Sequence, residues 1–152
     1  MLDNNEKYDT IKAAYNSQTV EEPIHESYND KRDFTTLDAW IKCRDVKIFF
    51  YKKILPLLPK EEKYNFDIQI RKASVSITAN IAEGYGRYHY QEGIQFYRIS
   101  RGSLYELKDH LISCYDFNYI DKGLKEEGEK LIESAKITLN DYINYVKSKQ
   151  GK

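Results

Sequence analysis

The stretch SVSITANIAEGYGRYHYQEG, residues 74–93, begins as an apolar helix but also carries an amide, a carboxylate and two glycines. At about 100° per residue, one face of a helix through this stretch is apolar and extends upstream; its members are Phe66, Ile70, Ala73, Ile77, Ile81 and Gly84. Asn80 lies at the edge of this face, with Glu83 beside it. The pattern predicts a core helix with a polar border.

That border repeats from turn to turn through Gln69, Ser76, Asn80, Glu83 and Arg87. Buried polar groups need hydrogen-bond partners. We therefore expect Ser76, Asn80 and Glu83 to form a structural polar network, with Arg87 or Arg101 as a partner. The alternative is that Glu83 acts as a catalytic acid or base with a raised pKa. No other part of the sequence supplies a substrate pocket for it.

The opposite face of this helix is also poor in charge, because it carries Val75, Thr78, Ala79 and Ala82. A helix without a polar face is buried on two sides. In a four-helix protein the second burial surface requires either the N-terminal segment or another subunit. We interpret Val75, Ala79 and Ala82 as an oligomer interface.

Three further segments have apolar residues at helical spacing. The four predicted helices run from Thr36 as N-cap to about 58, from 62–65 to about 86, from about 91 through 114, and from about 121 to 149. The first is expected to turn Leu37, Trp40, Ile41, Phe49, Ile54 and Leu58 inward and to end at Pro56 and Pro59. Without strand alternation, and with short connections, this pattern predicts an all-α, antiparallel up-down-up-down four-helix bundle.

The length, charge balance and cysteine content limit the classes to which this protein can belong. The chain has 152 residues with 24 basic and 24 acidic side chains, so nucleic-acid binding would need a local basic patch. Residues 1–33 are rich in acidic residues and predict a flexible acidic arm, followed by the bundle domain at 34–152. The two cysteines lack C-x-x-C spacing, and the sequence contains neither a signal peptide nor 18 consecutive apolar residues. We expect a cytoplasmic protein that does not enter a membrane.

Three motifs in order resemble a known family. SITANIAEGYGR, residues 76–87, resembles the S-I-P-A-N-I-A-E-G-x-G-R signature of the four-helix-bundle family encoded in 23S rRNA intervening sequences, with Thr78 where proline is usual. The segments YNFDIQIRKASVSI, 64–77, and FYRISRGSLYELKDHL, 96–111, are similar to its flanking motifs. The family includes the accessory variability determinant of diversity-generating retroelements. The resemblance implies a homo-oligomer, with a pentameric barrel favoured, that partners reverse transcriptase and nucleic acid.

The third predicted helix carries the best candidate binding surface. Away from its core face, arginine and lysine alternate with tyrosine, and further basic residues precede the helix; the candidate nucleic-acid or partner-binding residues are Arg87, His89, Arg98, Arg101, Tyr105 and Lys108, with Tyr97 on the same side. Such side chains contact phosphates and stack on bases. The alternative is that Arg101 and Lys108 pair with carboxylates of neighbouring helices while the tyrosines pack.

Other chemistry lacks the necessary spacing. The histidines form no Glu-x-x-His pairs for a di-iron site, and zinc would need clustered Cys and His, so we expect no metal and no cofactor. The sequence favours a non-enzymatic oligomeric accessory protein that binds RNA or DNA, or a nucleic-acid-handling enzyme such as a reverse transcriptase. The rivals are a protein-only adaptor or scaffold and a bundle enzyme that uses Glu83.

Overall fold

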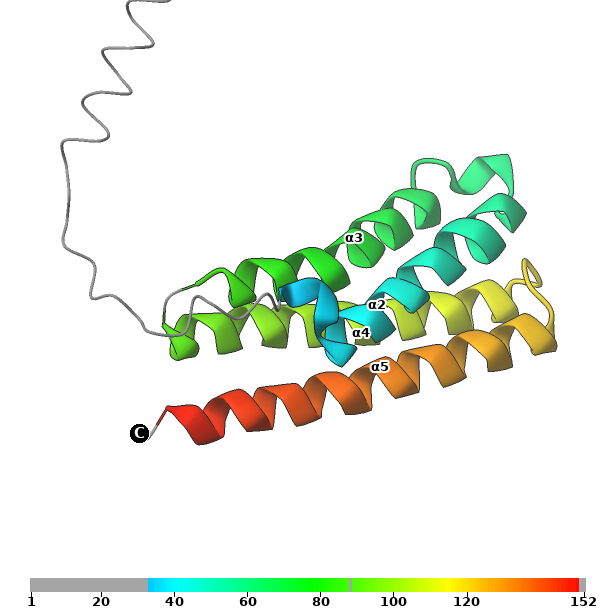
Figure 1. Cartoon of the computed structure of the whole chain (residues 1–152). Helices are drawn as coiled ribbons and strands as arrows, with labels where there is room; N and C mark the ends of the chain where they lie inside the picture. Colours follow the sequence, from blue (N-terminus) through cyan, green and yellow to red (C-terminus); the bar gives the residue numbers. More distant parts are fainter. Residues whose placement is uncertain (1–32, 88, 151–152) are drawn as a thin grey trace, which may run out of the picture. The chain divides into compact units, whose positions relative to one another are not determined.

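The computed structural model describes residues 33–87 and 89–150 (Figure 1). The predicted acidic arm lies outside the described residues except for Asp33. Four α-helices dominate the described part: α2 (Asp38–Phe49), α3 (Phe66–Tyr85), α4 (Tyr90–Asp116) and α5 (Lys122–Lys149). These two described ranges contain no β-strand. The all-α prediction is confirmed.

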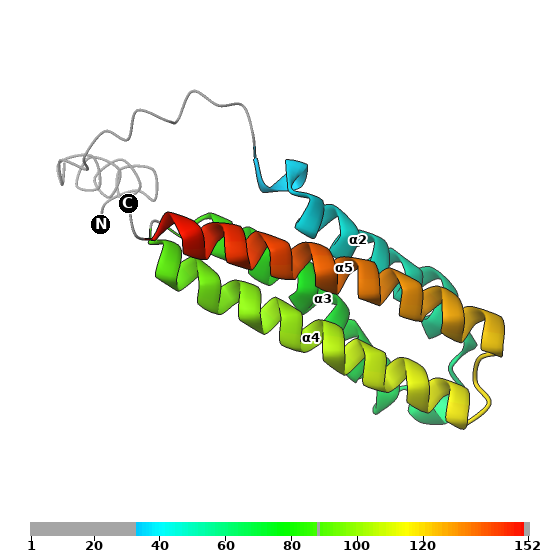
Figure 2. The ribbon, with the colours of Figure 1, turned by 90° about the horizontal axis from the view of Figure 1, so that it is seen from below.

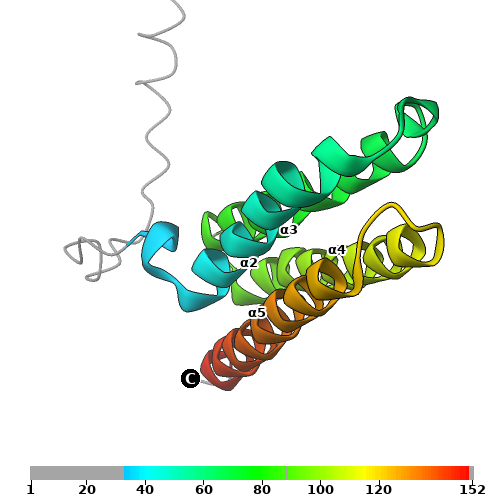
Figure 3. The ribbon, with the colours of Figure 1, turned by 90° about the vertical axis from the view of Figure 1, so that its right-hand side faces the viewer.

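The four helices surround one apolar core. Figure 1 shows the α2–α3 and α4–α5 connections at one end and the α3–α4 connection at the other. Figure 2 shows α4 and α5 lying side by side, and Figure 3 shows α2 beside α3. The largest fully buried side chains come from all four helices and the turn after α2: Val46, Phe50, Ile54, Ile70, Ile77, Ile81, Leu104, Leu107, Leu111, Ile132, Leu139 and Ile143. The helix packing is that of a bundle.

The first predicted helix consists of α2, a π-helix and a 3-10 turn, Leu55–Leu57, so the helical run ends close to the predicted position 58 but only its first part is α-helical. Thr36 is not its N-cap, because it lies inside a 3-10 turn, Phe34–Thr36, whose start is capped by the Asp33 carboxylate accepting from the Phe34 N–H at 2.7 Å. At its far end α2 widens into a π-helix, Phe50–Ile54. Proline has no N–H and its ring clashes with the carbonyl four residues earlier, so the regular helix stops ahead of Pro56.

The inward face of the first segment matches the prediction except at one residue: Phe49 and Ile54 are buried and Leu37, Trp40 and Leu58 pack against the core, but Ile41 does not. Ile41 is exposed, whereas Ala39, Cys43 and Val46 enter the core. Trp40 is half-buried and meets the ring of Phe34 edge to face, with ring centroids 5.4 Å apart. Trp40 therefore packs against both the core and the 3-10 turn that precedes α2.

The other three helices match their predicted ranges to within a few residues, and two caps fix the α4–α5 connection. After α4, Asn118 adopts a φ of 60°, and the Tyr119 N–H donates to the Cys114 carbonyl at 2.8 Å. This geometry is a Schellman motif, in which Asn replaces the usual glycine. The Asp121 carboxylate then caps α5 by accepting from the Leu124 N–H at 2.8 Å.

Two glycines bring α3 and α4 together. A Cβ atom added at Gly84 would lie 2.6 Å from Cε1 of Tyr97 and 2.9 Å from the carbonyl oxygen of Gly93. A Cβ atom at Gly93 would lie 2.9 Å from the carbonyl oxygen of Gly84. The two backbones are therefore in direct contact where α3 ends and α4 begins.

Gly84→Ala should destabilise the protein by about 1–3 kcal/mol, the usual cost of overpacking, because backbone atoms of Gly93 cannot move away as a flexible side chain would. Gly102→Ala is the matched control in α4. A Cβ atom there meets nothing within 4 Å, and alanine favours helix over glycine. Chemical denaturation of both variants checks this, and equal stabilities would contradict the close contact.

Candidate nucleic-acid interface

A small polar network joins α3 to α4 beside the core. The hydroxyls of Ser76 and Ser103 are 2.8 Å apart, and Nδ2 of Asn80 donates to Oγ of Ser76 at 2.8 Å and to its carbonyl at 2.9 Å. Deeper in the core, the Ser100 hydroxyl donates to the Ile77 carbonyl at 2.6 Å. These bonds fix the register of α4 on α3 and with it the face that α4 turns outward.

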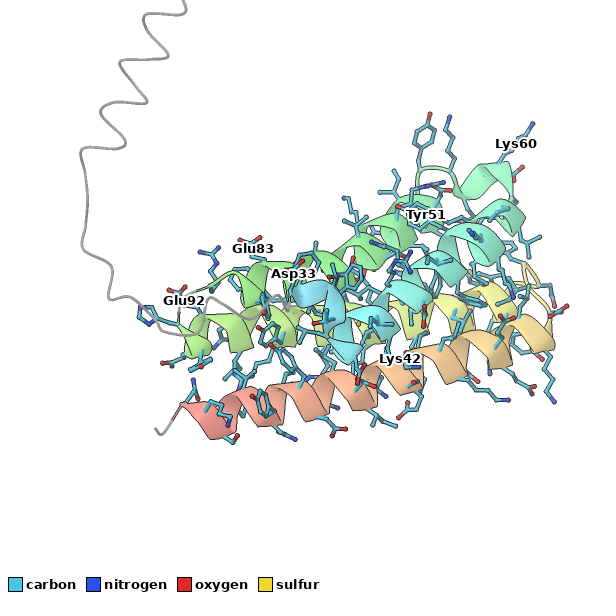
Figure 4. The ribbon with its side chains drawn as sticks, in the orientation of Figure 1. Asp33, Lys42, Tyr51, Lys60, Glu83 and Glu92 are labelled. Carbon is cyan, nitrogen blue, oxygen red and sulfur yellow. The ribbon has the colours of Figure 1, made fainter. Side chains whose placement is uncertain are left out.

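Glu83 pairs with Arg87, as expected, but the pair is exposed and lies apart from the bonds of Ser76 and Asn80, so the expectation of one network needs correction. The Glu83 side chain is 52% exposed, and its carboxylate accepts from Nη2 of Arg87 at 2.6 Å, one helical turn further on. Figure 4 shows Glu83 on the outer side of α3. The physical reason is its position at the end of the polar border, where it lies beyond the serines and meets solvent.

Asn80→Ala should lower the free energy of unfolding by about 1 kcal/mol, because Ser76 loses two hydrogen bonds at a half-buried site. Glu83→Ala should change it by less than about 0.5 kcal/mol, because an exposed ion pair contributes little. Thermal denaturation of the two variants side by side checks that Asn80→Ala loses more stability than Glu83→Ala. A larger loss for Glu83→Ala would mean that the carboxylate has a buried role.

The predicted binding residues of α4 form one stripe. We call Arg98, Arg101, Tyr105 and Lys108 the basic stripe; their spacing of three, four and three residues places them on one side of the helix over about 15 Å. Arg98 is exposed and has no ion pair among the described residues. Tyr105 is 53% exposed. Arg101 and Lys108 are half-buried along the border with α5.

Helix α5 supplies the partners of the basic stripe. Arg101 donates to the amide oxygen of Asn140 at 3.0 Å, so its charge is not neutralised by a carboxylate. Nζ of Lys136 lies 4.4 Å from the ring centroid of Tyr105 and bonds Glu133 at 2.9 Å. The hydrogen bond that Lys136 donates to Glu133 raises the pKa of Lys136. The same bond, with a smaller contribution from the charge of Lys108, lowers the pKa of Glu133. Lys136 of α5 thus lies between Glu133 and the Tyr105 ring of the basic stripe.

The other predicted binding residues lie apart from the basic stripe. Arg87 precedes α4, where its guanidinium carbon stacks 4.8 Å from the ring centroid of Phe96. His89 occupies the N-cap position of α4 but makes no side-chain cap. Tyr97, which we placed on the same side as the stripe, is buried. The structure thus brings together only the residues from Arg98 to Lys108.

The predicted oligomer interface lies on the outer surface of α3. Val75 is 50% exposed, Ala79 is exposed and Ala82 is half-buried. Thr78, which we assigned to the same face, is buried. Its hydroxyl accepts a hydrogen bond from Nζ of Lys47 on α2 at 2.9 Å. The exposed apolar surface therefore comprises Val75 and Ala79 and continues onto Ile48 of α2 and Tyr51 of the π-helix that follows it, which share a shallow hollow with Val75.

A pocket at the end of the bundle was missed by the sequence reasoning. It has a volume of about 390 Å³ and is lined mainly by tyrosines and two cations, from the α3–α4 junction and the last turns of α5: Gly84, Tyr85, Arg87, Tyr90, Gly93, Tyr97, Tyr142, Tyr145, Val146 and Lys149. We call it the tyrosine pocket. The abundance of tyrosine was visible in the sequence, but its convergence at one end was not.

The cysteines and the acidic residues offer no further site. Cys43 and Cys114 are buried free thiols, and burial raises the pKa of Cys43 to about 12 and that of Cys114 to about 11. Within residues 33–87 and 89–150, no group of three or more His, Cys, Asp or Glu side chains is arranged to hold a metal ion. None of the helices in these ranges is both long and apolar enough to cross a bilayer.

The fold and the surface of α4 define an all-α helical-bundle protein with a basic, aromatic stripe on one long helix. The model of the family described as 23S rRNA-intervening sequence protein matches residues 35–141. The chain belongs to this family, and the resemblance noted in the sequence is confirmed. A search of curated proteins found no match. The matched range includes α2, α3, α4 and most of α5.

Proposed function

We propose that this protein is a non-enzymatic accessory protein that binds RNA through the basic stripe of α4. The observation that carries the proposal is that Arg98, Arg101 and Lys108 share one side of α4 with Tyr105, whose ring is approached by Lys136 of α5, in a chain without net charge. Arginine and lysine bind phosphates, and an exposed tyrosine ring stacks on a base. RNA is the nucleic acid named because single-stranded RNA presents unstacked bases to an exposed aromatic ring.

The alternative that Arg101 and Lys108 only pair with carboxylates has weaker support. Arg101 bonds an amide, and the Glu133 carboxylate of α5 is already bonded to Lys136. The enzyme alternative is weakened by the exposure of Glu83 and its pairing with Arg87. In a third alternative, that of a protein-only adaptor, the basic stripe binds a protein, such as a reverse transcriptase, and does not contact RNA.

RNA binding should depend steeply on salt, and Arg98→Ala/Arg101→Ala should reduce the slope of log affinity against log salt by about two for each chain in contact. Fluorescence anisotropy with a short labelled RNA, single-stranded or duplex, between about 50 and 200 mM salt measures this. The control is Lys52→Ala/Lys60→Ala, which removes two exposed charges near the end of α2. Absence of RNA binding by the wild type at low salt would leave the adaptor as the function.

We further propose that the antiparallel bundle assembles into a homo-oligomer, with a pentamer favoured, through the outer face of α3. The exposure of Val75 and Ala79 next to Tyr51 supports this, because a second copy would remove this apolar surface from water. Assembly would also repeat the basic stripe, so one RNA could contact several chains at once. Such multivalent binding strengthens weak individual contacts.

Ala79→Glu should dissociate the oligomer while circular dichroism stays helical, because a carboxylate would be buried unpaired between subunits. Light scattering should report several chain masses for the wild type and a single chain mass for the variant. Gln69→Glu places the same charge on an exposed position of the same helix and should leave assembly unchanged. A monomeric wild type at micromolar concentration would refute the interface.

A further inference from the structure

The tyrosine pocket has the chemistry of a small-molecule site. Its volume of about 390 Å³ lies within the range of about 300–1,000 Å³ that is common for such sites. Its floor is made by the Gly84–Gly93 contact and by Tyr97, which is 3% exposed, and its rim carries Tyr90 and Tyr145, which are both more than half exposed. A ligand would thus enter between exposed rings and rest on a buried one.

The rings of the pocket are already arranged for aromatic contacts. Tyr97 and Tyr142 meet edge to face with centroids 5.0 Å apart, and Tyr142 and Tyr145 stack at an interplanar angle of 23° with centroids 6.3 Å apart. Burial raises the pKa of both Tyr97 and Tyr142, so their hydroxyls stay neutral. A planar ring can stack on the outer face of Tyr145 or lie against the edges of its neighbours.

The charged side chains at the rim of the pocket favour a ligand that carries a negative charge. Arg87 and Lys149 both line the pocket, and none of its lining residues is a carboxylate. Nζ of Lys149 lies over the ring of Tyr145, 5.2 Å from its centroid, so a base that stacks on this ring displaces the cation toward the ligand's phosphate. Arg87 bonds Glu83 through one nitrogen, and the guanidinium group carries further N–H donors for phosphate oxygens.

We propose that the tyrosine pocket binds one nucleotide of a single-stranded RNA, with the base stacked on Tyr145 and the phosphate held by Lys149 and Arg87. This inference rests on the proposed RNA binding and deepens it, because the basic stripe then holds the strand while the pocket takes an unstacked base. Recognition of splayed bases by aromatic side chains is the usual mode for single-stranded RNA. The pocket discriminates single strands from duplexes, which the stripe alone does not.

Adenosine 5′-monophosphate is the probe for the pocket itself, measured by isothermal titration calorimetry. Tyr145→Ala/Lys149→Ala should lower its affinity by about tenfold or more, in line with the loss of one base stack and one phosphate contact. Adenosine and ribose 5-phosphate should each bind more weakly than the nucleotide. Tyr145 is exposed near the end of α5, so these substitutions leave the core intact.

The matched control is Lys63→Ala/Tyr64→Ala. Nζ of Lys63 lies 5.3 Å from the ring centroid of Tyr64, nearly the geometry of the Lys149–Tyr145 pair, but this pair precedes α3 while the pocket lies at its far end, about 30 Å away. Nucleotide affinity should be unchanged in this variant. Equal losses in both variants, or no binding of adenosine 5′-monophosphate by the wild type, would overturn the pocket.

A second measurement separates this inference from the proposed function. A short RNA with 2-aminopurine at one end should change fluorescence on binding to the wild type and to Arg98→Ala/Arg101→Ala at saturating protein, but not to Tyr145→Ala/Lys149→Ala. RNA binding by anisotropy without any 2-aminopurine response would overturn the pocket and leave the stripe. Nucleotide binding in the absence of RNA binding would overturn both the RNA function and single-stranded RNA as the ligand of the pocket.

Discussion

The contact between Gly84 and Gly93 determines the geometry of the whole described domain. Because neither residue has a Cβ, the backbones of α3 and α4 touch next to the connection between the two helices. That approach places the Ser76 hydroxyl within reach of Ser103 further along the two helices. Once α4 is fixed in this rotation, its core face, its stripe of cations and the floor of the tyrosine pocket follow from helical periodicity alone.

Helical periodicity in the sequence was sufficient to predict three of the four helices because their cores are continuous. The periodic apolar residues of α3, α4 and α5 each extend over 20 residues or more, and breakers such as Asp121 or Gly86 stand at their ends. The first helix was predicted less well. The Thr36 predicted as its N-cap lies in a 3-10 turn instead, and its apolar residues are too many for periodicity alone to show that Ile41 faces outward.

The candidate site was partly predictable for a related reason. Residues on one helix share a face whatever their neighbours do, so the spacing from Arg98 to Lys108 was enough to group them. Residues on a border depend on how closely the next helix approaches, which is why Asn80 is enclosed and Glu83 is not. The tyrosine pocket joins the α3–α4 junction to residues about 50 positions later in the chain, and no local pattern indicates such a meeting.

The two thiols give the protein a property that is useful for following its motion. Thiolate is the reactive form of cysteine, and at neutral pH a buried thiol with a pKa of about 12, as at Cys43, provides nearly none of it. The folded chain therefore behaves toward alkylating reagents as if it had no cysteine. Modification of Cys43 or Cys114 requires the helices to separate first. The rate of alkylation therefore reports how often the bundle opens transiently.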